Sequence, residues 1–260
     1  MRLLYDHDGV ALYHGDATHM DLVGEGSVQL IATSPPFNCG RGYDVHDDRM
    51  AWPDYYAMLA AFLVEARRVL WDGGVLALNV PISVRVPEDA RHGGERDEPV
   101  GVTVWQMVRE AGFLRREILH WIKVAADDGI ENGALATGTA VGPDNNPYLR
   151  PCVEWILLAS RGRYHLDNGS GRRGQTELEL CKDVWHLRGR NPGWHPAPWA
   201  EEIPARLIRL YTLHPDHVVL DPFGGTMITC WAARKAGRRA IGIDKSEAYV
   251  RQAAGPLLCT

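Results

Sequence analysis

Short apolar runs alternate along this chain with longer segments in which apolar residues recur every three or four positions. The first pattern is typical of buried strands and the second of amphipathic helices. We expect strands at residues 28–33, 75–80, 117–123, 153–160, 218–220 and 240–243. We expect helices at residues 54–70, 102–111, 203–213, 226–236 and 246–254. This alternation predicts an α/β fold with a doubly wound, mostly parallel sheet and helices on both faces.

Two stretches interrupt the alternation. Charged residues fill 85–98, which we predict to be a loop, and residues 161–198 are rich in Arg, Gly, Trp and Pro with little periodicity. With 260 residues, of which 45% are hydrophobic, the chain can bury one large core. We therefore predict a single domain over residues 1–260 that carries an inserted aperiodic region.

Composition limits the class of protein further. The formal net charge of −5 disfavours a protein that coats nucleic acid, although an enzyme that touches it through one cleft needs only a local positive surface. The five cysteines form no CxxC pair and the eleven histidines share no metal-ligand spacing, so we expect reduced thiols and no metal site. We see no membrane span and no signal peptide, and we expect a cytoplasmic protein with no membrane partner.

One expected strand runs directly into a glycine-rich turn and a helix, with the sequence Asp221-Pro222-Phe223-Gly224-Gly225-Thr226. Glycine lets the backbone approach a ligand, and the start of a helix offers free N–H groups. About twenty residues later another strand ends at Asp244, where a carboxylate can accept hydrogen bonds from ribose hydroxyls. The pair favours a nucleoside-type cofactor over a turn whose glycines only permit tight packing.

A second motif, Thr33-Ser34-Pro35-Pro36-Phe37, follows the first expected strand. The two prolines stiffen the backbone and lack N–H groups, which leaves nearby carbonyls free to accept hydrogen bonds from another molecule. Ser34 adds a hydroxyl and Phe37 a flat aromatic face. A pair of prolines can also simply end a strand, and the motif alone does not decide between the two interpretations.

Together the two motifs resemble those of the amino-methyltransferases of DNA. Further segments share the likeness, in order, along nearly the whole chain: Gly15-Asp16-Ala17, Asn38-Cys39-Gly40-Arg41-Gly42-Tyr43, Arg68-Val69-Leu70-Trp71-Asp72-Gly73-Gly74 and His195-Pro196-Ala197-Pro198-Trp199. Because Ser-Pro-Pro-Phe precedes the glycine motif, the order resembles the permuted β group of that family. The resemblance implies a Rossmann-like methyltransferase sheet, with a catalytic half at about 10–123 and a cofactor half at about 195–254.

The resemblance also implies S-adenosylmethionine as the methyl donor, with a role for each matching residue. Those implied for the cofactor are Asp16 near the adenine, Asp244 at the ribose, Phe223 and Gly225 along the turn, and Asp221, His195 and Pro196 by the methionine end. Those implied for the base are Ser34, Pro35, Pro36 and Phe37. The family usually has a second glycine where this chain has Met227. A side chain there would crowd the turn.

The implied reaction explains the residue types. An exocyclic amine is a poor nucleophile, and hydrogen bonds to Ser34 and the Pro35 carbonyl would aim its lone pair at the sulfonium methyl. The base must first leave the stack, and Phe37 would support it. Ser34 stands where adenine-directed relatives usually have aspartate, so we predict a site-specific DNA methyltransferase that favours cytosine N4. The alternatives are an adenine-N6 DNA methyltransferase, an RNA methyltransferase and a non-catalytic DNA-binding relative.

The aperiodic region is where the family places target recognition, at about 163–190. We predict that its basic residues contact double-stranded DNA, aided by a loop at about 124–146: Arg163, Arg172, Arg173, Lys182, Arg188 and Arg190. A homodimer and a restriction endonuclease partner are both compatible with the resemblance. Cys39 lacks the Pro-Cys pair of carbon-5 cytosine methyltransferases, so we predict an unreactive thiol. The helix dipole explains the basic cluster at 234–239 at least as well as DNA does.

Overall fold

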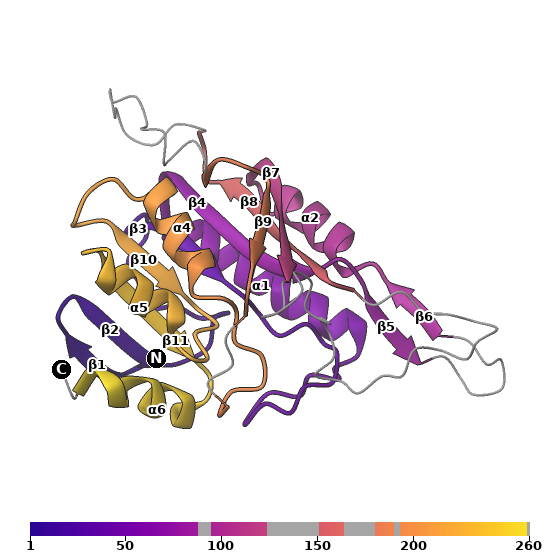
Figure 1. Ribbon diagram of the computed structural model, residues 1–260, viewed down its shortest axis with the longest axis horizontal. Coiled ribbons are helices and arrows are strands. Elements are labelled where there is room, and N and C mark those ends of the chain that lie inside the picture. Colours follow the sequence, from indigo (N-terminus) through magenta and orange to yellow (C-terminus); the bar gives the residue numbers. More distant parts are fainter. Residues whose placement is uncertain (88–94, 124–150, 164–179, 190–192, 259–260) are drawn as a thin grey trace.

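A nine-stranded sheet runs through the part of the chain that the computed structural model describes, residues 1–87, 95–123, 151–163, 180–189 and 193–258 (Figure 1). Its strands are β1 Arg2–His7, β2 Val10–His14, β3 Val28–Thr33, β4 Leu70–Pro81, β7 Leu114–Lys123, β8 Val153–Ser160, β9 Val184–Leu187, β10 Val218–Asp221 and β11 Arg239–Asp244. The order is β1-β2-β11-β10-β3-β4-β8-β7-β9. Of these strands only β1 and β8 run against the others, so the predicted mostly parallel sheet is confirmed.

Helices cover both faces of this sheet. On one face α1 Trp52–Val69 and α2 Val100–Glu110 pack on alternate strand residues such as Leu76 and Leu78. On the other face α4 Glu202–Tyr211, α5 Ile228–Lys235 and α6 Glu247–Leu258 share a core with Val75 and Ala77. Successive side chains of a strand point to opposite faces, so one apolar strand can serve both cores. The doubly wound arrangement is therefore confirmed.

The structure corrects several expected boundaries. Gly73 and Gly74 do not separate a helix from a strand; α1 ends at Val69 and β4 begins at Leu70. The expected loop 85–98 contributes to a small hairpin, β5 Val84–Pro87 and β6 Glu95–Glu98. The aperiodic region contains β9, which pairs with β7. No helix in the described residues is both long and apolar enough to cross a membrane.

The first two strands, β1 and β2, were not predicted, although their turn carries a signal. Asp8 and Gly9 form a two-residue connection with φ of 52° and 75°. Positive φ at both positions defines the type I′ turn that suits a twisted hairpin, and Asp-Gly is a preferred sequence for it. The residues on either side of the turn alternate only weakly between apolar and polar, so the sequence pattern did not predict the two strands.

Candidate active site

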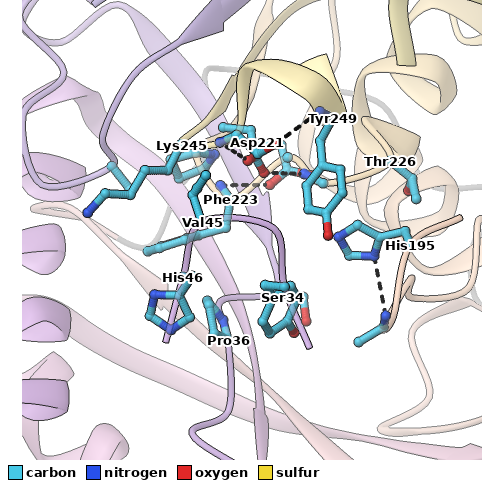
Figure 2. Close-up of a pocket in the computed structure, with 18 of the residues that line it drawn as sticks. Ser34, Pro36, Val45, His46, His195, Asp221, Phe223, Thr226, Lys245 and Tyr249 are labelled. Carbon is cyan, nitrogen blue, oxygen red and sulfur yellow. Dashed lines mark hydrogen bonds between the residues drawn. The ribbon is translucent and has the colours of Figure 1, made fainter. Parts of the chain in front are cut away.

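A cavity opens where neighbouring parallel strands end (Figure 2). Residues that follow β2, β3, β10 and β11 line it together, because the carboxyl ends of these strands meet at one edge of the sheet. Eight of the predicted site residues lie in its wall: Asp16, Ser34, Pro36, His195, Asp221, Phe223, Gly225 and Asp244. Pro35, Phe37 and Pro196 are not among the lining residues; Pro35 is buried and Phe37 half-buried.

The glycine turn after β10 is tied to the end of β11 by Asp244. Its Oδ2 accepts the N–H of Gly225 at 2.7 Å, and its Oδ1 accepts the N–H of Ser246 at 2.7 Å. Gly225 has φ of +48°, and a Cβ there would lie 2.6 Å from Nε2 of His195. Both facts favour glycine at this position. Each carboxylate oxygen of Asp244 keeps a further lone pair for a ligand, and burial raises the pKa of this carboxyl.

Asp221 is a nearly inaccessible carboxyl in the cavity wall. Thr33 Oγ1 donates to its Oδ1 at 2.6 Å, and the N–H of Phe223 does so at 3.3 Å. Burial raises its pKa to about 6 in spite of these hydrogen bonds. A cationic ligand group beside Asp221 would favour its ionised form. The site therefore suits a ligand with a positive charge at this point.

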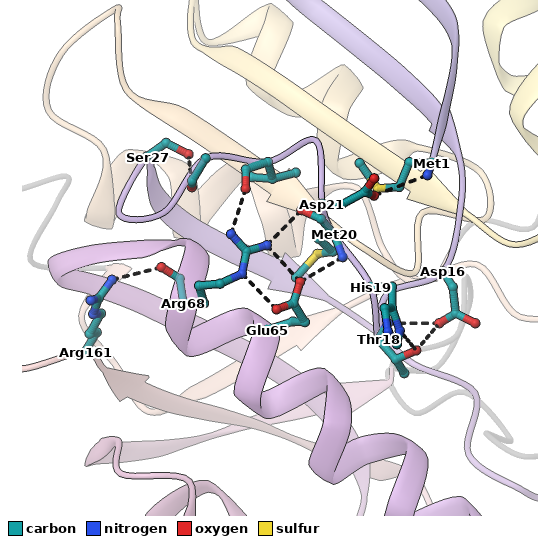
Figure 3. Close-up of polar contacts among 12 residues, drawn as sticks. Met1, Asp16, Thr18, His19, Met20, Asp21, Ser27, Glu65, Arg68 and Arg161 are labelled. Atoms are coloured by element: carbon teal, nitrogen blue, oxygen red, sulfur yellow. Dashed lines mark hydrogen bonds and ion pairs between the residues drawn. The ribbon is translucent and has the colours of Figure 1, made fainter.

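Asp16 is held in the wall by the segment that joins β2 to β3. Its Oδ1 accepts the N–H and the hydroxyl of Thr18 at 2.9 and 2.8 Å, and its Oδ2 pairs with Lys245 at 3.1 Å. Burial acts against these contacts, but together they lower the pKa of Asp16. The same segment is fastened to α1 by the side chains of Glu65 and Arg68 (Figure 3).

Glu65 and Arg68, in the last turns of α1, make these contacts. Arg68 donates to the carbonyls of Met20 and Val23 at 2.8 and 3.0 Å, and it pairs with Glu65 at 2.8 Å. Glu65 in turn accepts the N–H of Met20 at 2.8 Å. An arginine whose planar group bridges two carbonyls and a carboxylate holds a loop more rigidly than a lysine would. Asp16 is thereby presented to the cavity.

Aromatic rings form another part of the wall. The ring of His195 contacts those of Tyr249 and Tyr43 at centroid distances of 4.9 and 5.9 Å. Its Nδ1 accepts the N–H of Ala197 at 3.3 Å. Burial lowers the pKa of His195 to about 4, so the ring is neutral at neutral pH. A neutral ring beside Gly225 leaves the positive charge of a ligand unopposed.

The Ser-Pro-Pro-Phe motif presents one hydroxyl to the cavity. Ser34 Oγ lies in the wall and accepts a hydrogen bond from Nδ2 of Asn79 at 3.1 Å. The Pro36 carbonyl is already engaged, because Tyr55 Oη donates to it at 3.0 Å.

The segment after the motif, residues 38–50, is organised by a buried carboxylate. Asp48 accepts the N–H groups of Asn38, Cys39 and Arg41 at 2.8, 3.1 and 2.8 Å. This brings Tyr43, Val45 and His46 into the cavity wall, which the sequence did not predict. Partial burial and the charge of Asp48 raise the pKa of Cys39 to about 11. That pKa supports the prediction of an unreactive thiol.

The same segment also contacts α6 and the residues that precede it. Ser246 Oγ donates to Asp44 at 2.6 Å, and the N–H of Asp44 donates to Tyr249 Oη at 3.2 Å. Ser246, Lys245 and Tyr249 also line the cavity, and none was predicted. Their nearness to Asp244 in the sequence was the available signal.

Met227 does not crowd the cavity. It has φ of 55° at the start of α5, a left-handed conformation that glycine adopts without strain. Its side chain is fully buried and is absent from the cavity wall. A Cβ on Gly224 or Gly242 would come within 2.3 or 2.5 Å of its sulfur. The methionine fills space that these two glycines leave in the core.

The predicted DNA-contacting residues are only partly described. Arg172, Arg173, Arg190 and the loop 124–146 lie outside the described residues. Arg163 follows β8 at the edge opposite the cavity and pairs with Asp72 at 3.3 Å. Lys182 precedes β9 and Arg188 follows it; both are exposed.

The basic cluster at 234–239 has structural contacts. Arg234 pairs with Asp8 at 2.7 Å, and Arg238 donates to Thr212 Oγ1 at 3.1 Å. Lys235 pairs with Glu201. These contacts favour the structural interpretation of the cluster over DNA binding.

Solved structures with the same fold define the class. The protein TTHA0409 of Thermus thermophilus, crystallised in complex with S-adenosyl-L-methionine, matches with a TM-score of 0.70 and 25% identity, over 95% of this chain and 93% of that one. The PvuII DNA methyltransferase, described as cytosine-N4-specific, matches with a TM-score of 0.71 and 18% identity, over 94% and 85%. The protein has the fold of the S-adenosylmethionine-dependent methyltransferases.

Sequence relatives give the family within that class. The model of a DNA methylase family, the N6 and N4 methyltransferases, matches residues 28–255. The type II methyltransferase M.MjaVI of Methanocaldococcus jannaschii is 32% identical over 71% of this chain and 88% of its own length. M1.MboII of Moraxella bovis is 30% identical over 90% of each chain. The chain belongs to this family and is an S-adenosylmethionine-dependent DNA methyltransferase.

Proposed function

We propose that this enzyme methylates the N4 amine of cytosine in double-stranded DNA. The observation that carries the proposal is the Ser34 hydroxyl in the cavity wall. A hydroxyl can both donate and accept hydrogen bonds. Cytosine presents an amine hydrogen beside the acceptor N3, and one hydroxyl can meet both. Adenine presents a similar edge, so the product must be identified directly.

The cavity supports a division of labour among its residues. S-adenosylmethionine would lie along Asp16, Asp244, Phe223 and Gly225, with its charged groups near Asp221 and His195. Its sulfonium would supply the methyl group to the base. Ser34 and the Pro35 carbonyl would accept the two amine hydrogens, which holds the nitrogen in line with the methyl. Transfer would then be a direct displacement in which the N–C bond forms as the methyl–sulfur bond breaks, the neutral thioether leaves and the methylated amine loses one proton to water, so no covalent enzyme intermediate is needed.

Three further parts of the proposal concern the partners. The segment from about 163 to 190, with the loop at 124–146, would contact the DNA, except Arg163 itself, which lies at the edge opposite the cavity. Because the relatives are type II methyltransferases, we extend the proposal to a restriction endonuclease that cuts the same site. Phe37 is half-buried and does not line the cavity. Its ring would therefore have to move when DNA binds in order to stack on the flipped base.

Product analysis tests the proposal. DNA from cells that express the protein would be digested to nucleosides and analysed by mass spectrometry. We expect N4-methylcytosine from the parent protein and much less from Ser34→Ala. Calorimetric binding of S-adenosylmethionine by the variant would show that it is folded. N6-methyladenine as the sole product would reverse the assignment of the base and leave the family unchanged.

A further inference from the structure

A part-buried chain of polar side chains runs from Ser34 across the neighbouring strands β4, β8 and β7. Asn79 on β4 donates from Nδ2 to Ser34 Oγ at 3.1 Å and to Glu154 Oε2, on β8, at 2.9 Å. Lys123 at the end of β7 pairs with the other oxygen of Glu154. These groups come from neighbouring strands, since β3, β4, β8 and β7 are consecutive in the sheet. The role of Ser34 in the proposed function makes this chain relevant to catalysis.

The contacts determine which way the Asn79 amide faces. Both hydrogens of Nδ2 are engaged, one by Ser34 and one by Glu154. In the flipped orientation the amide oxygen would face the Glu154 carboxylate, and two acceptors would repel each other. Lys123 keeps Glu154 in place, so the ion pair fixes the amide orientation.

The orientation carries a cost in stability. Asn79 is 1% exposed, and its Oδ1 is buried with no hydrogen-bond partner among the residues that the structure describes. A buried acceptor without a partner is unfavourable, and an apolar residue at this strand position would avoid the cost. Asn79 thus lowers stability while it donates a hydrogen bond to Ser34 in the cavity wall. This combination indicates a role other than stability.

We propose that Asn79 is a positioning residue that sets the hydrogen-bonding direction of the Ser34 hydroxyl. Because Ser34 Oγ accepts from Asn79, its own hydrogen and its remaining lone pair are left for the base. The lone pair then accepts from the substrate amine, and the hydroxyl hydrogen goes to the neighbouring ring nitrogen. This inference rests on the proposed function, in which Ser34 contacts the base.

Asn79 does not carry protons along this chain. Its amide nitrogen has no lone pair with which to accept a proton, so Glu154 is separated from Ser34 for proton transfer. Glu154 and Lys123 therefore act on the amide orientation and not as a general base. The inference concerns the geometry of the reactants and adds no chemical step.

A double-mutant cycle tests the inference. Single-turnover methyl transfer and the KM for DNA would be measured for the parent, Ser34→Ala, Asn79→Ala and the double variant. We expect Asn79→Ala to slow transfer by about ten- to a hundredfold with little change in KM. In the Ser34→Ala background, Asn79→Ala should slow transfer little further, because both substitutions remove the same Asn79–Ser34 hydrogen bond.

The outcomes separate this inference from the proposed function. If Ser34→Ala transfers methyl groups at the parent rate, the proposed role of Ser34 fails. If Ser34→Ala is slow and Asn79→Ala multiplies the loss independently, Asn79 has only a structural role and the inference is overturned. Gln29→Ala is the matched control, because Gln29 is a buried amide on β3 whose Oε1 accepts the Val218 N–H at the opposite edge of the sheet. It should lower stability and leave the transfer rate unchanged.

A second variant keeps the test informative if Asn79→Ala does not fold. In Asn79→Asp an ionised carboxylate cannot donate, so Ser34 would turn its hydrogen away from the base. A protonated carboxyl can donate, so the variant should regain activity as pH falls. We expect its transfer rate, relative to the parent, to fall as pH rises through the pKa of the new carboxyl. Parallel pH profiles for the two proteins would contradict the inference.

Discussion

Among single residues, Asp221 shows most directly how a binding site lowers stability. Its pKa is raised by burial to about 6 from a usual value of 3.8, so the ionised form is disfavoured in the folded, ligand-free protein. A raised carboxyl pKa means that the folded state binds its proton more tightly than the unfolded state. The contribution of Asp221 to stability is then greatest at low pH and falls as pH rises from about 4 to about 6.

Asp221→Asn should remove this loss. We expect the free energy of unfolding of the ligand-free variant to exceed that of the parent by on the order of 1–3 kcal/mol at pH 7, with the gain vanishing below pH 4. The same variant should bind S-adenosylmethionine more weakly, because it lacks the negative charge. Urea unfolding across pH and calorimetry would measure both effects.

A matched substitution separates burial from charge. Asp216 is exposed in the segment before β10, so Asp216→Asn removes a carboxyl without the burial cost. It should change neither stability nor cofactor affinity to a comparable extent. A stability gain for Asp221→Asn that does not vary with pH would show that the carboxyl pKa is not its source.

At the level of secondary structure, α5 begins with a residue in an unusual conformation. Met227→Gly would relieve the left-handed strain, which is worth about 1–2 kcal/mol, but would delete a fully buried side chain, which typically costs more. We expect a net loss on the order of 1–3 kcal/mol in the free energy of unfolding, with unchanged affinity for S-adenosylmethionine. A substantial change in affinity would mean that the side chain reaches the cavity after all.

Elements with continuous apolar runs could be predicted from the sequence. The bounds of β3 and β8 are those expected, because strands buried on both faces need apolar residues throughout. The β1–β2 hairpin and β9 lie at the margins of the sheet, where fewer buried positions leave a weaker pattern. In the hairpin β5–β6, β6 consists of charged residues and β5 has only two valines in four residues, so the apolar signal is short and weak.

A position in the cavity wall was predictable where one strand carries a motif to its end, as for Asp244 and Ser34. It was not predictable where long-range contacts decide placement. Tyr43 and His46 reach the cavity only because Asp48 gathers the backbone around it. Asn79 sits inside an apolar strand run, and its importance appears only when Ser34 and Glu154 are seen on either side of it.

On the scale of the whole molecule, an acidic protein must present DNA with a local positive surface. The cavity lies at the carboxyl edge of the sheet, and Arg188 follows β9 at that same edge. Lys182 stands at the other end of β9. DNA whose base reaches Ser34 should therefore pass closer to Arg188 than to Lys182.

We expect Arg188→Ala to weaken DNA binding and to reduce the salt dependence by about one unit, as for a lost phosphate contact. Lys182→Ala changes the net charge equally and serves as the matched control, with a smaller expected effect. DNA affinity measured over a series of salt concentrations gives both quantities. Equal behaviour of the two variants would show that position along β9 does not govern DNA contact.

The strand order has a consequence for how the protein is made. The strands β10 and β11 are the last to be synthesised, yet they lie between β2 and β3 in the finished sheet. Until residue 244 has left the ribosome, the hairpin β1–β2 and the sheet that begins at β3 have no connecting strands, and each has an unpaired edge. Such long-range pairing is slow and exposes nascent chains to misassociation. The enzyme's vulnerable period therefore lasts until β10 and β11 have been made and join the two parts.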